Sequence, residues 1–319
     1  GRAYTHTHTF SLPVSCLVHP KNLRTMYENG GDPYSGYWPL SAKYGIALER
    51  LCLILVVDGS RTRNLGSEME LKPGQIEDFE RDGYVVMKGA WSTEACDEFV
   101  DYMLDLQAGR KRVLHYEPRH ADDWERVIYR SHLEPRALQW MVDPRLSEPL
   151  AALLGGEAEC IQGMYNFKGT EQRWHQDEYH LPGCIGAWSA LVDVNVNNGT
   201  LEIQVGSHKG PAADKADFRV DEHGEPGRWQ GWEHEDVFCK FVRQNRMPEV
   251  AIEAEKGDLI FFHRRIIHRG GSILEPGSFR HSFVSHYIPK SFDPWPYEEA
   301  PRLRISFDRV CRFTDTGLE

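Results

Sequence analysis

From Leu71 onward, apolar residues recur with the spacing of amphipathic helices. The stretch LKPGQIEDFERDGYVVM, residues 71–87, predicts a short helix that breaks at Gly83 and is followed by a strand. Ser92 or Thr93 then caps a second helix, because hydroxyl side chains are favoured at a helix start. The apolar face of this second helix comprises Ala95, Phe99, Met103 and Leu106.

The hydrophobic pattern changes after two further helices, which are predicted over 134–142 and 146–154 and end at Gly155-Gly156. From Glu157 to Pro289, short apolar segments alternate with turn residues, as in antiparallel β structure. The segments are AECIQGMYNF, AWSALVDV, LEIQV, EVAIEA, DLIFF and FRHSFVSHYI. The turn signals between them are Asn197-Asn198-Gly199, Gly206-Ser207, Lys256-Gly257-Asp258 and Gly270-Gly271. We therefore predict a mainly β fold with flanking helices, built on a jelly-roll barrel.

The same pattern predicts the domain organisation. Residues 1–66 show no sustained periodicity, and we expect an N-terminal extension that is either a targeting segment or an artefactual addition. Residues 67–319 are expected to form one domain. Within it, the largely polar segment 207–249 separates two strands, and so long a loop predicts either a mobile lid that sets substrate choice or a solvated insertion. Its apolar exceptions are Trp229, Trp232, Phe238 and Phe241.

Composition narrows the class of partner. The chain has 319 residues, 40% of them hydrophobic, and 37 basic against 48 acidic residues give a net charge of −11. This charge disfavours nucleic acid or an anionic membrane as the main partner and favours a small molecule. The longest apolar run, 51–57, is too short for a membrane helix. The 7 cysteines form no CxxC pair, which indicates a reducing compartment, such as the cytoplasm. Oligomeric state is left open by the sequence.

Three His-x-Asp triplets are candidate metal-ligand pairs, and their surroundings distinguish them. His120-Ala121-Asp122 lies in RHADDWERVIYR, a charged stretch with helical character, where residues i and i+2 point in nearly opposite directions. His234-Glu235-Asp236 lies in a polar segment that predicts a solvated loop. His175-Gln176-Asp177 stands between strand-like segments, and in an extended chain its imidazole and carboxylate project from the same face. This third triplet is therefore the candidate for binding a metal.

A third ligand is available in GDLIFFHRRIIHRGG, which contains His263 and His268. Their separation of five places them on opposite faces of a regular strand, so an unbroken strand would point at most one of them inward. Two histidines and one carboxylate with open metal positions are typical of non-haem Fe(II) oxygenases, although the same set suits a zinc hydrolase. A barrel that binds a metabolite without turnover is a further alternative.

A candidate anion site follows twelve residues after His268. Arg280 and Ser282 in SFRHSFVSHY are predicted to share a strand face. A guanidinium and a hydroxyl together suit the distal carboxylate of 2-oxoglutarate, although an arginine on a strand can equally form a structural salt bridge.

Together these segments resemble the phytanoyl-CoA hydroxylase family of Fe(II)/2-oxoglutarate dioxygenases. The resemblance runs from about Leu71 to Pro289 through QIEDFERDGYVVM, WHQDEYHLPG, AWSALVDVNVNNGTLEIQVGSHKG, KGDLIFFHRRIIHRGG and FRHS. It implies a double-stranded β-helix, or cupin-like jelly roll. It also implies Fe(2+), 2-oxoglutarate and O2 as cofactor and co-substrates, with ascorbate as an optional addition. By this likeness, the residues implied to bind the metal and to be catalytic are His175, Asp177 and His268. Those implied to bind 2-oxoglutarate are Arg280, which anchors it, and Trp188 and Met164, which line its pocket.

The resemblance implies hydroxylation of a small molecule with release of succinate and CO2. Asp177 stands where related halogenases carry a small residue, so hydroxylation is favoured, while desaturation and ring formation stay open. Family members often carry Gly-Ser after the distal histidine; here Arg269-Gly270 follows, so Ser272 or Ser282 is expected to supply the hydroxyl. The acidic composition disfavours a polyanionic CoA thioester as substrate. The candidate residues for the substrate pocket are Tyr165, Gln172, Tyr179, Trp229, Trp232 and Arg265.

Overall fold

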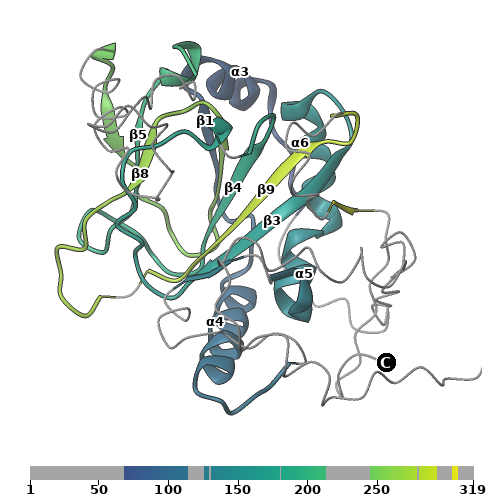
Figure 1. Ribbon diagram of the computed structural model, residues 1–319, viewed down its shortest axis with the longest axis vertical. Helices are drawn as coiled ribbons and strands as arrows, with labels where there is room; N and C mark the ends of the chain where they lie inside the picture. Colours follow the sequence, from purple (N-terminus) through teal and green to yellow (C-terminus); the bar gives the residue numbers. More distant parts are fainter. Residues whose placement is uncertain are drawn as a thin grey trace, which may run out of the picture. The chain divides into compact units, whose positions relative to one another are not determined.

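The computed structural model (Figure 1) describes residues 68–113, 126–128, 131–179, 181–212, 245–278, 280–292 and 304–307. The predicted N-terminal extension and most of the predicted lid, with its four aromatic residues, lie outside these ranges, as do the triplets at His120 and His234. The division of the chain into an extension, a domain and a lid stays a prediction. Across the described ranges, none of the helices has the length and apolar content that a membrane span requires.

The four predicted helices are confirmed, and their ends follow the expected chemistry. The helix α3 ends at Gly83, whose φ of 87° is the left-handed conformation that glycine adopts most readily. The next helix, α4, is capped by Ser92, whose hydroxyl accepts a hydrogen bond from the Ala95 amide at 3.1 Å. The helices are α3 (Pro73–Asp82), α4 (Thr93–Gln107), α5 (Pro135–Met141) and α6 (Ser147–Leu154).

Two antiparallel sheets form the β region within the described residues. The larger sheet has seven strands in the order β1-β7-β4-β9-β3-β10, with β2 paired to β3, and the smaller has the order β6-β5-β8. The strands of the larger sheet are β1 (Tyr84–Met87), β2 (Arg126–Ile128), β3 (Ala158–Asn166), β4 (Ile185–Ala190), β7 (Leu259–His263), β9 (Ser282–Pro289) and β10 (Ile305–Ser306). Those of the smaller sheet are β5 (Leu201–Gln204), β6 (Glu249–Ala251) and β8 (His268–Gly270). Most neighbouring strands are far apart in the sequence, as the predicted jelly roll requires.

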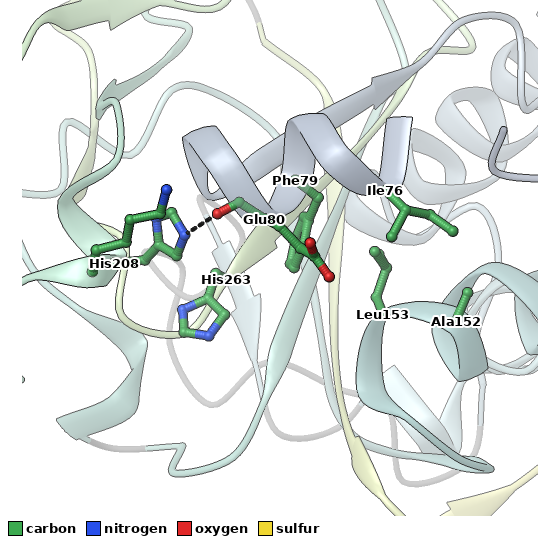
Figure 2. Close-up of a pocket in the computed structure, with 8 residues that line it drawn as sticks. Ile76, Phe79, Glu80, Ala152, Leu153, His208 and His263 are labelled. Carbon is green, nitrogen blue, oxygen red and sulfur yellow. Dashed lines mark hydrogen bonds between the residues drawn. The ribbon is translucent and has the colours of Figure 1, made fainter. Parts of the chain in front are cut away.

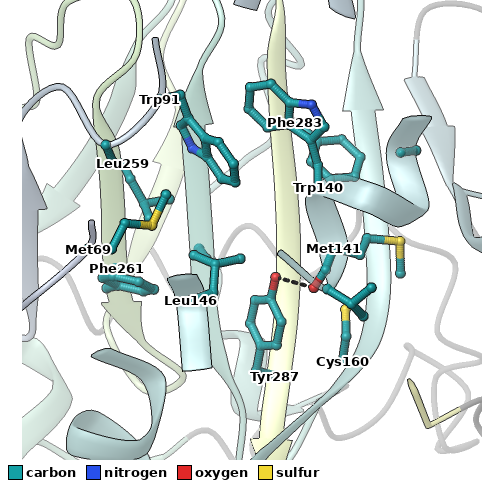
Figure 3. Packing of buried hydrophobic residues seen from close by; sticks show 14 of the residues in the cluster. Met69, Trp91, Trp140, Met141, Leu146, Cys160, Leu259, Phe261, Phe283 and Tyr287 are labelled. Carbon is teal, nitrogen blue, oxygen red and sulfur yellow. Dashed lines mark hydrogen bonds between the residues drawn. The ribbon is translucent and has the colours of Figure 1, made fainter. Parts of the chain in front are cut away.

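Both faces of the larger sheet are buried, each in a different hydrophobic core, and alternate residues of β9 belong to the two cores. Phe283 and Tyr287 project into a core shared with the helices, whereas Val284 projects into a second core shared with the smaller sheet. In the first core, the indole rings of Trp91 and Trp140 stack at 4.0 Å between centroids, and the Tyr287 hydroxyl donates to the Met141 carbonyl at 2.8 Å (Figure 3). The second core lies on the face of the larger sheet that is shared with the smaller sheet.

The strand that contains His263 does not continue to His268. β7 ends at His263, a turn follows, and His268 begins β8 in the other sheet, so the condition of an unbroken strand is not met. One local prediction was wrong: the helical character expected for RHADDWERVIYR fails at its end, because Arg126–Ile128 forms strand β2, in which Val127 pairs with Tyr165. Pairing with a neighbouring strand outweighs local helical spacing there.

Candidate metal centre and co-substrate site

His175, Asp177 and His268 lie together. One possible ligand atom from each lies within 4.8 Å of the others. Asp177 Oδ1 is 3.6 Å from His175 Nε2 and 3.8 Å from His268 Nε2. The two imidazole centroids are 4.1 Å apart. Two imidazole nitrogens and one carboxylate oxygen therefore face a common point, which is the donor set of a facial triad.

The backbone brings the two histidines together. The His175 amide donates to the His268 carbonyl at 2.9 Å, and the His268 amide donates back to the His175 carbonyl at 3.0 Å. This pair is an isolated antiparallel bridge beside β8. The chain leaves the extended conformation immediately afterwards, because Asp177 begins the 3-10 turn η6 (Asp177–Tyr179). The expected regular strand through the His-x-Asp triplet is therefore only a bridge.

Both histidines are oriented through their other ring nitrogen. Nδ1 of His175 is 2.8 Å from the Arg173 carbonyl, and Nδ1 of His268 is 3.1 Å from the Ile266 carbonyl. A carbonyl can only accept a hydrogen bond, so each Nδ1 carries the proton and each Nε2 keeps its lone pair. This arrangement prepares histidines for metal binding. The Gln172 amide lies 3.0 Å from His175 Nε2, beside the same point.

Asp177 is buried and bonds to a fourth side chain. His286 on β9 places its Nε2 3.2 Å from Asp177 Oδ2, the oxygen that does not face the two histidines. Burial alone raises the pKa of the Asp177 carboxyl, but the neighbouring imidazoles of His268, His286 and His175, together with the hydrogen bond from His286, lower it overall. The carboxylate is therefore ionised and available as a ligand at neutral pH.

Phe262 forms an apolar wall beside this cluster. Its ring centroid is 4.9 Å from that of His268 and 6.4 Å from that of His286. The ring occupies the space above Gly186, where a Cβ atom would overlap it. Glycine at this position therefore lets an aromatic ring shield one side of the site from water.

The inner faces of β3, β9 and β4 form ordered rows of side chains next to the cluster. Met164 and Trp188 are the direct cross-strand neighbours of Val284. One row further along, Asn166 pairs with Ser282, and the Asn166 amide donates to the Ser282 hydroxyl at 3.1 Å. Three residues expected at the co-substrate pocket, Met164, Trp188 and Ser282, thus lie on one face.

Arg280 is buried at the end of these rows without an acidic partner among the described residues. Its Nη1 donates to the Gly199 carbonyl, its guanidinium carbon lies 5.5 Å from the Trp188 ring centroid, and its Nε has no hydrogen-bond partner. Only 2% of the residue is exposed, and burial lowers its pKa from 12.5 to about 10. The side chain remains charged at neutral pH, so this buried cation has no counter-ion within the described part of the chain.

His263 lies elsewhere, at a pocket of about 310 Å³ between α3, α6 and the start of the predicted lid. Figure 2 shows its imidazole near that of His208, whose Nε2 bonds to the Glu80 carbonyl at 3.1 Å. The lining also includes the apolar side chains of Ile76, Phe79, Ala152 and Leu153. Burial, and to a lesser degree the charges of neighbouring side chains, lower the pKa of His263 to about 3. Of the two histidines in this segment, only His268 joins the cluster.

The remaining candidate residues have different outcomes. Tyr165 was wrongly placed in the substrate pocket: it points toward the helices, where its hydroxyl lies 3.0 Å from His281 Nδ1. Ser272 is exposed, whereas Ser282 is fully buried on the inner face. Arg265 donates to the Gly210 carbonyl. The side chain of Tyr179, together with Trp229 and Trp232, lies outside the described part of the chain.

Two residues near the site were not anticipated from the sequence. His286 shares the strand face of Ser282 and Val284, so the period-two pattern in RHSFVSH carries a signal for it. Asn166 carries the same kind of signal, two positions after Met164 on β3. In both cases the residue type alone did not distinguish a site residue from a buried structural one.

Comparisons with known proteins identify the family. A model described as phytanoyl-CoA dioxygenase (PhyH) matches residues 79–282. Peroxisomal phytanoyl-CoA dioxygenase of Rattus norvegicus is 31% identical over 125 residues, which is 38% of this chain and 34% of the rat protein. The match thus spans about a third of that relative. Ectoine dioxygenase of Bordetella bronchiseptica is 24% identical over 250 residues, 73% of this chain and 80% of that protein.

Solved structures show the same fold. The structure of EctD from S. alaskensis with 2-oxoglutarate and 5-hydroxyectoine has a TM-score of 0.52 at 18% identity, covering 72% of this chain and 82% of that one. The carbocyclase SnoK from nogalamycin biosynthesis has a TM-score of 0.51 at 19% identity, covering 69% and 85%. The predicted mainly β, cupin-like jelly roll is confirmed. The matched range is more than half of the chain and contains His175, Asp177 and His268, so this protein belongs to the phytanoyl-CoA dioxygenase (PhyH) family.

Proposed function

We propose that this protein is an Fe(II)- and 2-oxoglutarate-dependent dioxygenase that hydroxylates a small molecule and releases succinate and CO2. One observation carries the proposal: the larger sheet contacts both halves of the site. His286 on β9 bonds to Asp177 of the two-histidine, one-carboxylate cluster, and Trp188 on the neighbouring β4 contacts a buried arginine that has no acidic partner among the described residues. The first feature suits a metal with open positions, and the second suits an anionic co-substrate.

The residues present fit Fe(II). His175 Nε2, His268 Nε2 and Asp177 Oδ1 are the atoms expected to hold it, since both imidazoles are protonated on Nδ1 and the carboxylate is ionised. Bound iron supplies open coordination positions for the keto acid end of 2-oxoglutarate and for O2. The protein fixes the ligands, and Phe262 excludes water from one side of them.

The same residues fit 2-oxoglutarate. A buried guanidinium without an acidic partner among the described residues is costly, and a carboxylate that accepts a hydrogen bond from it offsets that cost. Arg280 is thus proposed to bind the distal carboxylate, with the buried Ser282 hydroxyl two residues further along the chain as a second donor. Trp188 and Met164, on either side of Val284, are proposed to pack against the carbon chain between the carboxylate and the metal.

The substrate is proposed to be a small organic molecule such as a polar metabolite, an organic acid or phosphonate, or a natural-product scaffold. Two relatives are named for phytanoyl-CoA and for ectoine, which are chemically very different molecules. The net charge of −11 favours substrates without the several negative charges of a CoA thioester. We do not expect nucleic acid or membrane partners, and we propose a cytoplasmic location, because the 7 cysteines of the sequence form no CxxC pair.

The proposal is tested by measuring O2 consumption and succinate formation with Fe(II) and 2-oxoglutarate over a metabolite library. Substrate-dependent succinate formation that requires Fe(II) and disappears in Asp177→Ala supports it. Zn(II)-dependent hydrolysis without O2 uptake would instead identify a zinc hydrolase, a function that gives the buried Arg280 no role. Ligand binding without turnover of any kind would identify a binding protein.

A further inference from the structure

The Asp177 carboxylate uses its two oxygens for different purposes. Oδ1 faces the Nε2 atoms of His175 and His268 at 3.6 and 3.8 Å, whereas Oδ2 accepts a hydrogen bond from His286 Nε2 at 3.2 Å. The His286 side chain therefore occupies the oxygen that points away from the proposed metal. Because it comes from the larger sheet, it also ties the cluster beside β8 to β9.

The surroundings of His286 define which nitrogen donates. An ionised carboxylate can only accept, so Nε2 carries the proton. Its Nδ1 is buried and has no hydrogen-bond partner among the described residues, and only 2% of the residue is exposed. Among the described residues, the imidazole therefore makes its hydrogen bond through Nε2, to Asp177.

Packing holds the imidazole of His286 in this position. Its cross-strand neighbours are Gln162 on β3 and Gly186 on β4. The Phe262 ring lies against its edge, with the two ring planes at 89°. Since Gly186 contributes no side chain, Phe262 fills the space and leaves His286 little room to turn away from Asp177.

We infer that His286 is a positioning residue that restricts Asp177 to binding the metal through Oδ1 alone. The inference rests on the proposed function, since it assigns a role toward Fe(II). Its consequence is chemical: a carboxylate that rotated to offer both oxygens would occupy one of the open positions that 2-oxoglutarate and O2 need. His286 is therefore expected to determine both metal affinity and the number of open positions.

The test compares His286→Ala and His286→Gln with the wild-type protein. The matched control is His281→Gln, which replaces another buried histidine just before β9 whose bond is to Tyr165. Anaerobic Fe(II) binding is measured by calorimetry, and the absorption of the Co(II)-loaded protein reports coordination number. Thermal unfolding without metal identifies any variant that fails to fold.

We expect His286→Ala to weaken Fe(II) binding by roughly 10- to 100-fold, the usual effect of removing a group that orients a metal ligand. Its Co(II) spectrum should shift toward higher coordination. His286→Gln, whose amide can donate to Oδ2, should recover most of both properties, and the control should match the wild type. Wild-type Fe(II) affinity and Co(II) spectrum in a folded His286→Ala, with Asp177→Ala defective, would overturn the inference and leave the proposed function standing. Wild-type affinity in Asp177→Ala would instead overturn the proposed function.

Discussion

His175 and His268 exchange two backbone hydrogen bonds, of 2.9 and 3.0 Å, although they lie in distant parts of the sequence. Residues that face each other across an antiparallel bridge project their side chains in the same direction. The relative position of the two imidazoles is therefore set by the backbone before any metal binds. A pre-formed pair of ligands lowers the ordering that metal binding requires.

His175→Ala, Asp177→Ala and His268→Ala are each expected to abolish Fe(II)-dependent succinate formation, because each removes one of three proposed ligands. The variants should stay folded, since the backbone bridge does not depend on the side chains. Calorimetric titration with Fe(II) measures the loss directly. The control is His263→Ala, which alters the pocket between α3 and α6 and should bind Fe(II) like the wild type. Equal losses at 263 and 268 would contradict the ligand assignment.

Arg280→Met should raise the KM for 2-oxoglutarate by roughly 10- to 150-fold, since a hydrogen bond to a charged group contributes about 1.5–3 kcal/mol. Fe(II) affinity should change little. Without 2-oxoglutarate, the variant should be at least as stable as the wild type, because it no longer buries a cation that has no acidic partner in the described ranges. Steady-state kinetics and thermal unfolding with and without 2-oxoglutarate distinguish these effects. An unchanged KM would remove Arg280 from the co-substrate site.

Gly186→Ala should disturb both packing and metal binding. The new methyl group would overlap the Phe262 ring, which is itself buried and contacts His268 and His286. Overpacking of this kind typically costs about 1–3 kcal/mol in the free energy of unfolding. The control is Gly74→Ala in α3, where a Cβ has no neighbour within 4 Å. Chemical denaturation measures both variants, and similar stabilities would contradict the packing argument.

The stability of the wild-type protein should fall in acid partly because of His263. Its pKa is about 3 in the folded protein against 6.5 for an ordinary histidine, so below about pH 6.5 only the unfolded chain takes up the proton. The contribution to stability is complete above pH 6.5 and is lost progressively down to about pH 3. His263→Gln should reduce the slope of unfolding free energy against pH by at most about 1.4 kcal/mol per pH unit. The reduction should be smaller than this limit because the side chain is partly exposed to solvent. Denaturation curves from pH 7 to 4 measure the slope, and parallel slopes would contradict the assignment.

The sequence predicted the helices and most strands because their signals are local. Ser92 and Gly83 mark helix ends through their own side chain or conformation. The break between His263 and His268 could not be predicted from local signals. It arises because the segment before the break pairs within the larger sheet and the segment after it pairs within the smaller sheet. The side chains of His263 and His268 therefore do not follow the alternation expected along one regular strand.

For the candidate site, the alternation of side chains along a strand predicts which residues share a face. Met164 and Tyr165 are adjacent on β3 and so cannot both face the same pocket, which the structure shows by turning Tyr165 toward the helices. By the same alternation, Ser282 and His286 lie on one face of β9. The bond between His286 and Asp177 could not be predicted, because it depends on how the two sheets approach each other in three dimensions.

Strand β9 places aromatic rings of the helix-facing core on one side and the polar groups of the site on the other. Inserting or deleting one residue within Ser282–Pro289 would exchange the two sides, moving Phe283 and Tyr287 into the site and His286 into hydrocarbon. Changes of length in this strand would thus destroy folding and chemistry together. New substrate preferences within such a scaffold should therefore arise through substitutions here and through length changes only in the connecting segments.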